Sequence, residues 1–318
     1  MIYVVKIITE GVKEMEIIQV ANLYKTYHNH DVLAGVNLTL EKGQIYGLIG
    51  KNGVGKTTLM RILTGLAFKT SGTFSLFGVS AEGDLEMQRR RIGAIVEAPS
   101  FYPFLSAREN LEYYRIQRGV VERDSIERVL EEVGLSDTGK KPYKSFSLGM
   151  KQRLGLALAL MGSPDLLILD EPTNGLDPQG IAELRHVLKR LNIEKDITML
   201  ISSHNLNELS TMATCYGFMH QGTMLEEIGA KELEEKCRIY IEVKVSDSKR
   251  LARLLETQLS CTGYEVLPKD IVRIYEYYED PSVISDLIAE NGMKLLQLEV
   301  KSADLEQYFL ELIGGKTV

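Results

Sequence analysis

The chain has 318 residues, of which 44% are hydrophobic and 25% are charged. These values are ordinary for globular proteins and exclude a disordered or fibrous class, and the length allows one large domain with a smaller one. The formal net charge of −7 argues against a nucleic-acid partner, because binding phosphates usually requires a basic face. Three cysteines without metal-ligand spacing indicate reduced thiols and not a disulfide framework.

The sequence contains no run of about 18 consecutive apolar residues, so we expect no transmembrane helix. Any membrane role therefore requires a separate partner. The apolar run from Met1 to Ile8 is short and is followed by charged residues without a small-residue cleavage site. A signal peptide is not expected, and the first strand is expected to begin near Met15.

Short β-rich runs alternate with segments of helical periodicity over residues 15–235, for which we predict an α/β domain. Each β-rich run is followed by a turn or a helix, which is typical of a parallel sheet covered by helices. Residues 98–163 are interpreted as a helical insertion between two halves of the sheet. The expected parallel strands are residues 45–49, 92–96, 166–169 and 198–202.

Residues 236–318 have a different pattern, with the order β-α-β-β-α-β-α. This order predicts a small, ferredoxin-like α+β accessory domain. The expected strands are residues 239–245, 264–267, 272–277 and 293–300, and the expected helices are residues 248–258, 281–291 and 303–313.

A phosphate-binding loop of the form GxxxxGK[ST] follows the strand IYGLI and precedes the helical segment TLMRILTGL. An ordinary glycine-rich turn is the alternative, but the motif has the strand and the helix that it requires. Its lysine is expected to contact the β- and γ-phosphates of ATP, and its first threonine to bind Mg²⁺. The expected nucleotide-binding residues here are Gly50, Lys51, Asn52, Gly53, Val54, Gly55, Lys56, Thr57 and Thr58.

The apolar strand Leu166–Leu169 ends in two carboxylates, Asp170 and Glu171, which is a Walker B pattern. Adjacent carboxylates at the end of a buried strand repel each other unless a cation balances them, so the pattern implies Mg²⁺. We expect Asp170 to bind the metal and Glu171 to polarise the attacking water. A solvated acidic turn is the alternative reading.

The segment SFSLGMKQR, residues 145–153, resembles the LSGGQ signature of ABC ATPases. The resemblance implies that Ser147 and the backbone of Gly149 bind the γ-phosphate of an ATP held by a second subunit. Taken alone, Ser147 is equally well explained as a helix N-cap. The fold expected for the larger domain is therefore the P-loop NTPase fold of an ABC ATPase.

The resemblance covers residues 17–225, with its motifs in the order of the family. It implies that residues 174–177 are the D-loop, which contacts the other subunit. It also implies that His204 is the switch histidine, which contacts the γ-phosphate and acts with Glu171. Tyr27, with Tyr24 as a substitute, matches the residue that stacks on adenine.

Two positions differ from the usual pattern of the family. Glu97 stands where a glutamine normally meets Mg²⁺ and the attacking water, so a carboxylate is expected at the metal. Leu148 and Met150 replace a glycine and a glutamine of the signature, whereas Ser147 and Gly149 are kept.

Glu97, the Phe101-Tyr102-Pro103 segment and the SLGMKQR signature resemble exporters that protect bacteria from lantibiotics and bacitracin-like peptides. The resemblance implies a homodimer that binds Mg-ATP and drives a separate membrane-spanning permease from the cytoplasmic face of the cell membrane. Residues 97–114 would face that permease. The alternatives are an ABC-type ATPase of translation or DNA maintenance, and a nucleotide-controlled interaction module. The transported substrate is not indicated by these residues.

Overall fold

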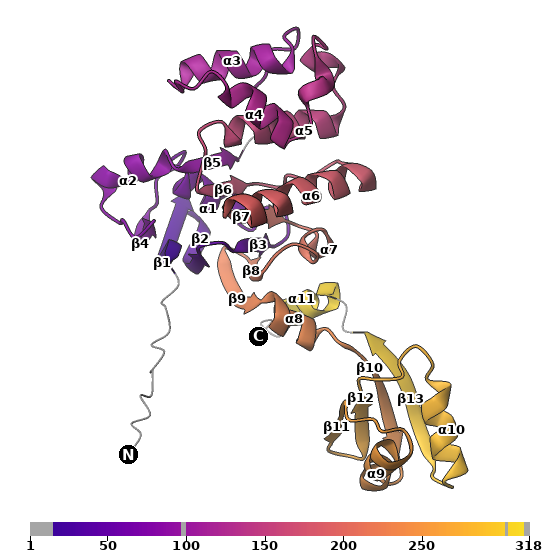
Figure 1. Cartoon of the computed structure of the whole chain (residues 1–318). Coiled ribbons are helices and arrows are strands. Elements are labelled where there is room, and N and C mark those ends of the chain that lie inside the picture. Colours follow the sequence, from indigo (N-terminus) through magenta and orange to yellow (C-terminus); the bar gives the residue numbers. More distant parts are fainter. Residues whose placement is uncertain (1–14, 97–99, 303–304, 315–318) are drawn as a thin grey trace, which may run out of the picture. The chain divides into compact units, whose positions relative to one another are not determined.

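The computed structural model describes residues 15–96, 100–302 and 305–314 (Figure 1). Contacts between residues divide the chain into two units, Met1–Ala230 and Lys231–Val318. The division of the chain at residue 235 into an ATPase domain and an accessory domain stays a prediction.

The centre of unit 1 is a six-stranded sheet with the strand order β5-β6-β7-β3-β8-β9. Its first five strands are parallel, and β9 is antiparallel to β8. Every residue of β3, β6 and β7 is buried, as is typical of parallel strands with helices on both faces. The strands are β3 (Ile45–Ile49), β5 (Ile92–Ile95), β6 (Leu166–Leu169), β7 (Thr198–Ser203), β8 (Cys215–His220) and β9 (Thr223–Gly229).

A second, antiparallel sheet of unit 1 has the order β2-β1-β4. It consists of β1 (Glu16–Tyr27), β2 (His30–Glu41) and β4 (Ser71–Leu76). One buried apolar cluster contains residues of both sheets and of α1 (Lys56–Leu63), among them Ile18, Leu38, Leu48, Leu59 and Ile168. The two sheets and α1 therefore share a core, which fixes the loop between β3 and α1.

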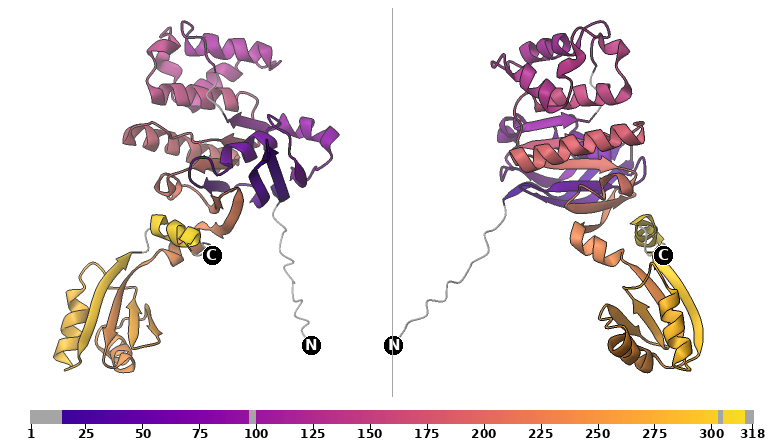
Figure 2. Two further views of the ribbon diagram at one scale, coloured as in Figure 1. Left: turned by 180° about the vertical axis from the view of Figure 1, so that it is seen from behind. Right: turned by 45° about the vertical axis from the view of Figure 1, so that its right-hand side comes forward.

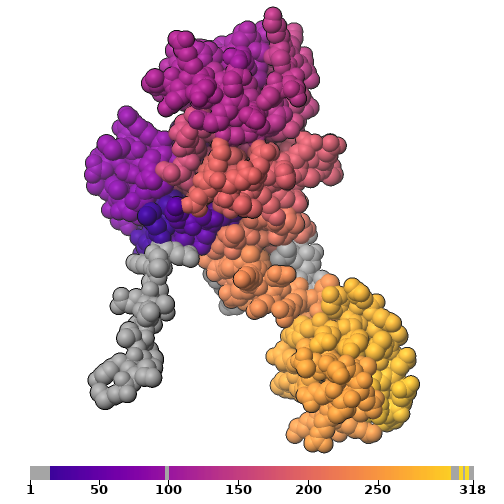
Figure 3. Space-filling model, in the orientation of Figure 1, coloured from indigo at the N-terminus to yellow at the C-terminus, as the bar shows by residue number. Residues whose placement is uncertain are grey.

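The helices of the insertion lie together beyond β5, as Figures 1 and 2 show. In Figure 3 they form a lobe of unit 1, coloured magenta. Ser106 begins the first helix with a capping box, in which its side chain and that of Glu109 each accept a backbone N–H. The insertion contains α3 (Ala107–Gln117), α4 (Ser125–Glu132), the 3-10 turns η1 (Ser136–Thr138) and η2 (Tyr143–Ser145), and α5 (Leu148–Leu160).

The remaining helices of unit 1 lie beside the sheets. They are α2 (Glu82–Arg89), α6 (Pro178–Lys195) and α7 (Leu206–Leu209). The predicted strand bounds are correct to within one residue: β5 ends at Ile95 instead of Val96, and β7 continues to Ser203. The mixed α/β fold with a parallel sheet, predicted for a P-loop NTPase, is confirmed.

Unit 2 has an antiparallel sheet with the order β11-β12-β10-β13, built from the predicted succession of elements. β12 ends at Ile274, three residues before the predicted end; the backbone bends at residues 275–276, and Tyr277 has a φ of 61°, which is not a strand conformation. Its elements are α8 (Ala230–Lys236), β10 (Ile239–Val245), α9 (Ser248–Gln258), β11 (Tyr264–Leu267), β12 (Ile271–Ile274), α10 (Ser282–Glu290), β13 (Leu295–Ser302) and α11 (Leu305–Gly314).

Glu242 on β10 joins three strands of this sheet. Its carboxylate lies 3.3 Å from Arg273 on β12 and 2.5 Å from Lys301 on β13. The hydrogen bond from Lys301 is the main cause that lowers the pKa of Glu242, and Arg273 acts in the same direction. A group whose pKa is lowered in the folded state stabilises that state above the unfolded pKa, and the stabilisation is lost as pH falls through the folded pKa.

We expect Glu242→Gln to lower the free energy of unfolding of unit 2 by about 1 kcal/mol at pH 7, because one acidic group serves two cations. The difference from the wild type should shrink as the pH falls through the folded-state pKa of Glu242, which lies below its ordinary value, because the wild-type carboxylate is then protonated too. Urea unfolding over a series of pH values from 7 downward measures this. Glu299→Gln is the control, because Glu299 is 52% exposed and lies 3.8 Å from Lys301. Equal effects of both variants would contradict the prediction.

Candidate active site

The loop from Gly50 to Gly55 connects β3 with α1. Gly53 and Gly55 have φ values of 83° and 111°, which glycine adopts readily. A Cβ atom at Gly55 would lie 2.7 Å from the carbonyl oxygen of Val32, and one at Gly50 would lie 2.6 Å from that of Met219. Larger residues do not fit at these two positions, so the loop backbone packs directly against β2 and β8.

Lys56 is the first residue of α1, and its side chain is only 5% exposed. Its Nζ donates to the carbonyl oxygens of Gly50, at 2.6 Å, and Lys51, at 3.3 Å. It also lies 3.1 Å from Oε1 of Glu171. The ammonium is thus held beside the loop and the N-terminus of α1, where the helix dipole favours anions.

Asp170 lies directly after β6 and accepts hydrogen bonds from two neighbouring elements. Thr57 Oγ1 on α1 donates to one carboxylate oxygen at 2.6 Å. Ser202 Oγ on β7 donates to the other at 2.6 Å and accepts from the backbone N–H of Glu171 at 2.8 Å. The structure therefore brings together Thr57 and Asp170, the two described residues that were predicted to bind a metal.

Glu171 and His204 follow β6 and β7, which are adjacent parallel strands, so both residues lie at the same edge of the sheet. His204 Nδ1 lies 2.7 Å from Glu171 Oε2, and the His204 backbone N–H donates to the same oxygen at 3.3 Å. Glu171 has a φ of 47°, an uncommon conformation for a residue other than glycine. Its carboxylate is held between the ammonium of Lys56 and the ring of His204.

Ser147 is the N-cap of α5, and its hydroxyl accepts a hydrogen bond from the backbone N–H of Met150 at 3.3 Å. Residues 147–150 line a cavity of about 500 Å³ together with residues 175–177, from the predicted D-loop, and the start of α6. No residue of the loop 50–58 is among its described lining residues. The signature and the phosphate-binding loop thus belong to separate sites of one chain.

Similarity to known proteins agrees with this arrangement. A family model described as ABC transporter matches residues 33–174. The bacitracin transport ATP-binding protein BcrA of Enterococcus faecalis is 42% identical, over 94% of this chain and 97% of its own. The chain belongs to the ATP-binding subunits of ABC transporters.

The lantibiotic transport ATP-binding protein SrtF of Streptococcus pyogenes is 46% identical to this ATPase subunit, over 69% of this chain and 94% of its own. A solved dimeric ATP-binding cassette in a post-hydrolysis state, bound to ADP and Pi, is 25% identical with a TM-score of 0.60. That similarity covers 67% of this chain and 98% of the solved one.

Family membership establishes that the subunit binds ATP and is an ATPase. The predictions of the family and of its activity are therefore confirmed. Among the helices that the structure describes, none is both long and apolar enough to span a bilayer.

Tyr27, the residue predicted to stack on adenine, lies at the end of β1 and is 40% exposed. The ammonium of Lys25 lies 4.4 Å from the centre of its ring. The ring of Tyr24, the possible substitute, packs near Gly35, where a Cβ atom would lie 3.0 Å from its hydroxyl. Tyr24 is 41% exposed, much like Tyr27, and Tyr27 stays the residue predicted to stack on adenine.

Glu97, predicted to reach the metal, lies outside the described residues. Ser202, which the sequence analysis did not select, holds both Asp170 and the backbone of Glu171. The sequence shows only a hydroxyl residue at the end of a buried strand, two positions before His204, and this does not indicate a contact with Asp170. A second hydroxyl, that of Ser203, lies beside it on β7.

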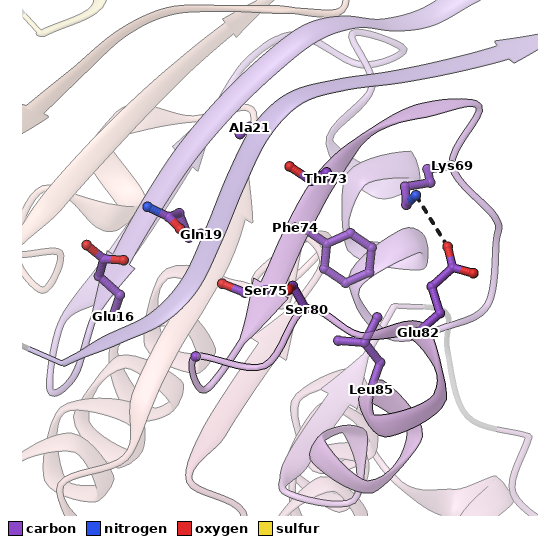
Figure 4. A pocket seen from close by; sticks show the side chains of 11 residues that line it. Glu16, Gln19, Ala21, Lys69, Thr73, Phe74, Ser75, Ser80, Glu82 and Leu85 are labelled. Carbon is purple, nitrogen blue, oxygen red and sulfur yellow. Dashed lines mark ion pairs between the residues drawn. The ribbon is translucent and has the colours of Figure 1, made fainter.

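A cavity of about 470 Å³ lies on the three-stranded sheet, between β1, β4 and α2 (Figure 4). The ion pair between Lys69 and Glu82, at 3.3 Å, lies at one side of it. None of the residues predicted to bind ATP or to act in catalysis is among its lining residues. This cavity is therefore separate from the nucleotide site.

Proposed function

We propose that the subunit forms a Mg-ATP-dependent homodimer that drives a separate membrane permease in the export of peptide antibiotics. The observation that carries this proposal is the presence of two complementary half-sites on one chain. One contains the loop 50–58 with Glu171 and His204, and the other contains the signature cavity at Ser147. A two-fold axis would place the signature of each copy opposite the loop of the other.

The residues fit Mg²⁺ as well as ATP. Thr57 and Asp170 present a hydroxyl and a carboxylate, which are hard oxygen ligands. Among the described residues, no group of three or more His, Cys, Asp or Glu could hold a metal by itself. Mg²⁺ commonly uses one or two protein oxygens together with substrate phosphates, so this small ligand set is suitable. When bound, the ion would balance phosphate charge, and Glu97 stays a predicted further ligand.

The residues of the loop half-site can position and polarise the reactants. Loop N–H groups and Lys56 would bind the β- and γ-phosphates. Glu171 is held by Lys56 at one oxygen and by His204 at the other. It would accept a hydrogen bond from the attacking water and so orient it. His204 is partly exposed beside Glu171 and would contact the γ-phosphate. Positioning and charge neutralisation supply most of the catalysis in phosphoryl transfer.

The dimer predicts that Glu171→Gln protein changes from monomer to dimer on addition of Mg-ATP. Ser147→Arg in this background should abolish the change, because a large cation would occupy the position expected for the partner's γ-phosphate. Light scattering with and without Mg-ATP measures the mass. Ser136→Arg is the matched control, since Ser136 is exposed on η1 of the same insertion. A protein that binds ATP and stays monomeric with the permease present would contradict the shared site.

The permease is expected to contact the aromatic segment of residues 100–114. Phe104 is 75% exposed, and Tyr102 and Tyr113 are also exposed, with their rings packed edge to face. Exposed aromatic groups of this kind mark interaction surfaces.

Bound to such a permease, the subunit would lie at the cytoplasmic face of the membrane. Stimulation of ATPase activity by a co-purifying membrane protein would support it, whereas stimulation by ribosomes or DNA would favour a role without transport.

The names of the relatives support export of bacitracin-like or lantibiotic peptides, since BcrA and SrtF are described as transport proteins for these compounds. Expression of the subunit with its permease should raise the resistance of a sensitive bacterium to bacitracin or a lantibiotic. The same pair with Glu171→Gln should give no protection. Unchanged sensitivity with an active ATPase would assign the subunit to another substrate.

A further inference from the structure

Glu208 on α7 lies one turn after His204 and accepts hydrogen bonds from two different segments. Its Oε2 accepts from Thr173 Oγ1 at 2.5 Å and from Ser203 Oγ at 3.1 Å. Its other oxygen lies 3.5 Å from the side-chain amide of Asn205. Thr173 and Ser203 are both fully buried, so their hydroxyl groups depend on partners within the protein.

These contacts connect the segments that carry the proposed catalytic groups. Thr173 belongs to the tight turn after Glu171, in which the backbone N–H of Asn174 donates to the Glu171 carbonyl. Ser203 precedes His204, and its carbonyl accepts the N–H of Gly50 at 3.3 Å. Glu208 therefore lies where the turn after β6, the end of β7 and the phosphate-binding loop meet.

We infer that Glu208 is a positioning residue, which holds Glu171 and His204 at hydrogen-bond distance by joining Thr173 to Ser203. The inference rests on the roles proposed above for Glu171 and His204. The backbone of Glu171 is in an uncommon conformation, and such a residue keeps its place only when its surroundings restrain it. The Thr173–Glu208–Ser203 contacts supply a restraint in addition to the direct contact between Glu171 and His204.

The chemistry of the contact favours a carboxylate at this position. One oxygen of Glu208 accepts the O–H of Thr173 and shares the O–H of Ser203 with the carbonyl oxygen of Asn205, which lies 3.0 Å from Ser203 Oγ. An ionised acceptor makes shorter and stronger hydrogen bonds than a neutral one. Glutamine has the same length and keeps one acceptor oxygen, so it should restore part of the restraint. Alanine removes the restraint, leaves the buried Thr173 hydroxyl without this acceptor and leaves the Ser203 hydroxyl to the carbonyl of Asn205.

Glu208→Ala in the full-length protein should lower kcat for ATP hydrolysis about 10- to 100-fold, because small displacements of catalytic groups have effects of this size. The Kd for ATP should change less than about twofold, since the phosphates are bound by the loop 50–58. Glu208→Gln should regain most of the rate. Asn207→Ala, at an exposed position of the same short helix, is the control and should match the wild type.

Thr173 provides a second test that leaves Glu208 intact. Thr173→Val removes the hydroxyl at nearly constant volume and should lower kcat, whereas Thr173→Ser keeps the hydroxyl and should not. The double variant Thr173→Val, Glu208→Ala should be no slower than Glu208→Ala alone, because both changes break one link. Hydrogen exchange should become faster over residues 171–177 as well as 203–208 in Glu208→Ala, and this readout needs no turnover.

A wild-type kcat in both Glu208→Ala and Thr173→Val would overturn the inference, provided that Glu171→Gln is slow. A wild-type rate in Glu171→Gln would instead overturn the proposed role of Glu171. If Glu208→Ala does not fold, Glu208→Gln and the two Thr173 variants decide, because each changes a single polar group. Equal rates for Thr173→Val and Thr173→Ser would then reject the positioning role.

Discussion

Glu171→Gln should lower kcat for ATP hydrolysis by about 100-fold or more, because a general base typically contributes a factor of this size. Glutamine keeps the length of the side chain but has no charge, so it polarises water poorly and loses the 3.1 Å ion pair with Lys56. Lys56 keeps its own position in Glu171→Gln and can still bind phosphate. The Kd for ATP should therefore stay within a few-fold of the wild type.

Single-turnover hydrolysis and equilibrium binding of ATP, measured on the same protein, separate these two effects. Glu194→Gln on the exposed side of α6 is the matched control, since it makes the same chemical change away from the site. Turnover of Glu171→Gln at the wild-type rate would show that another group activates the water.

Lys56→Ala should weaken ATP binding by about 100-fold, a loss that corresponds to one or two charge-assisted hydrogen bonds to phosphate. The ammonium is buried and oriented by the carbonyl groups of Gly50 and Lys51, so it is already held in place beside the loop. The change also leaves Glu171 without its cation, which adds repulsion between this carboxylate and the phosphates.

Titration with a fluorescent ATP analogue at constant Mg²⁺ measures the affinity of Lys56→Ala. Lys140→Ala, in the exposed segment after η1, removes one positive charge at a distance from the loop and is the control. If both variants bound ATP equally well, the assignment of Lys56 to the phosphates would be wrong. A thermal unfolding curve checks that the loss does not result from an unfolded protein.

The fold of unit 1 was predictable because its strands carry a strong local signal. The runs Ile45–Ile49 and Leu166–Leu169 are apolar throughout, and the structure buries every residue of both. Such runs identify parallel strands, and the glycine and acidic residues that follow them identify the loops of the site. Asp170, Glu171 and His204 could therefore be placed at one edge of a sheet without coordinates.

The hydrogen bonds that hold these residues in place could not be predicted from the sequence in the same way. Glu208 and Thr173 are 35 positions apart in the sequence, and their hydrogen bond depends on how two loops leave adjacent strands. The hydrogen bond from Ser202 to Asp170 was equally hard to predict, because no sequence pattern distinguishes a strand serine that makes such a bond from one that only packs. Motifs are local, whereas hydrogen-bond partners across strands are set by register and loop geometry.

In unit 2 the order of elements was predictable and their ends were less so. The residues at 272–277 suggested a longer strand, but the backbone bends directly after Ile274 and is left-handed at Tyr277. A similar difference occurs before β13, where the N–H of Met293 still donates to the carbonyl of Ile288 at the end of α10. Backbone conformations of this kind follow from tertiary packing, which composition and periodicity do not describe.

The left-handed backbone conformation of Glu171 affects which residue is favoured at this position. A left-handed conformation costs an ordinary residue roughly 1–2 kcal/mol, and glycine would avoid most of that cost. Glycine at this position would relieve the backbone but would leave the buried ammonium of Lys56 without its carboxylate, and we expect it to give a poor ATPase. Under the proposed role of Glu171, the backbone at this position favours glycine, whereas turnover and the contacts with Lys56 and His204 favour the carboxylate.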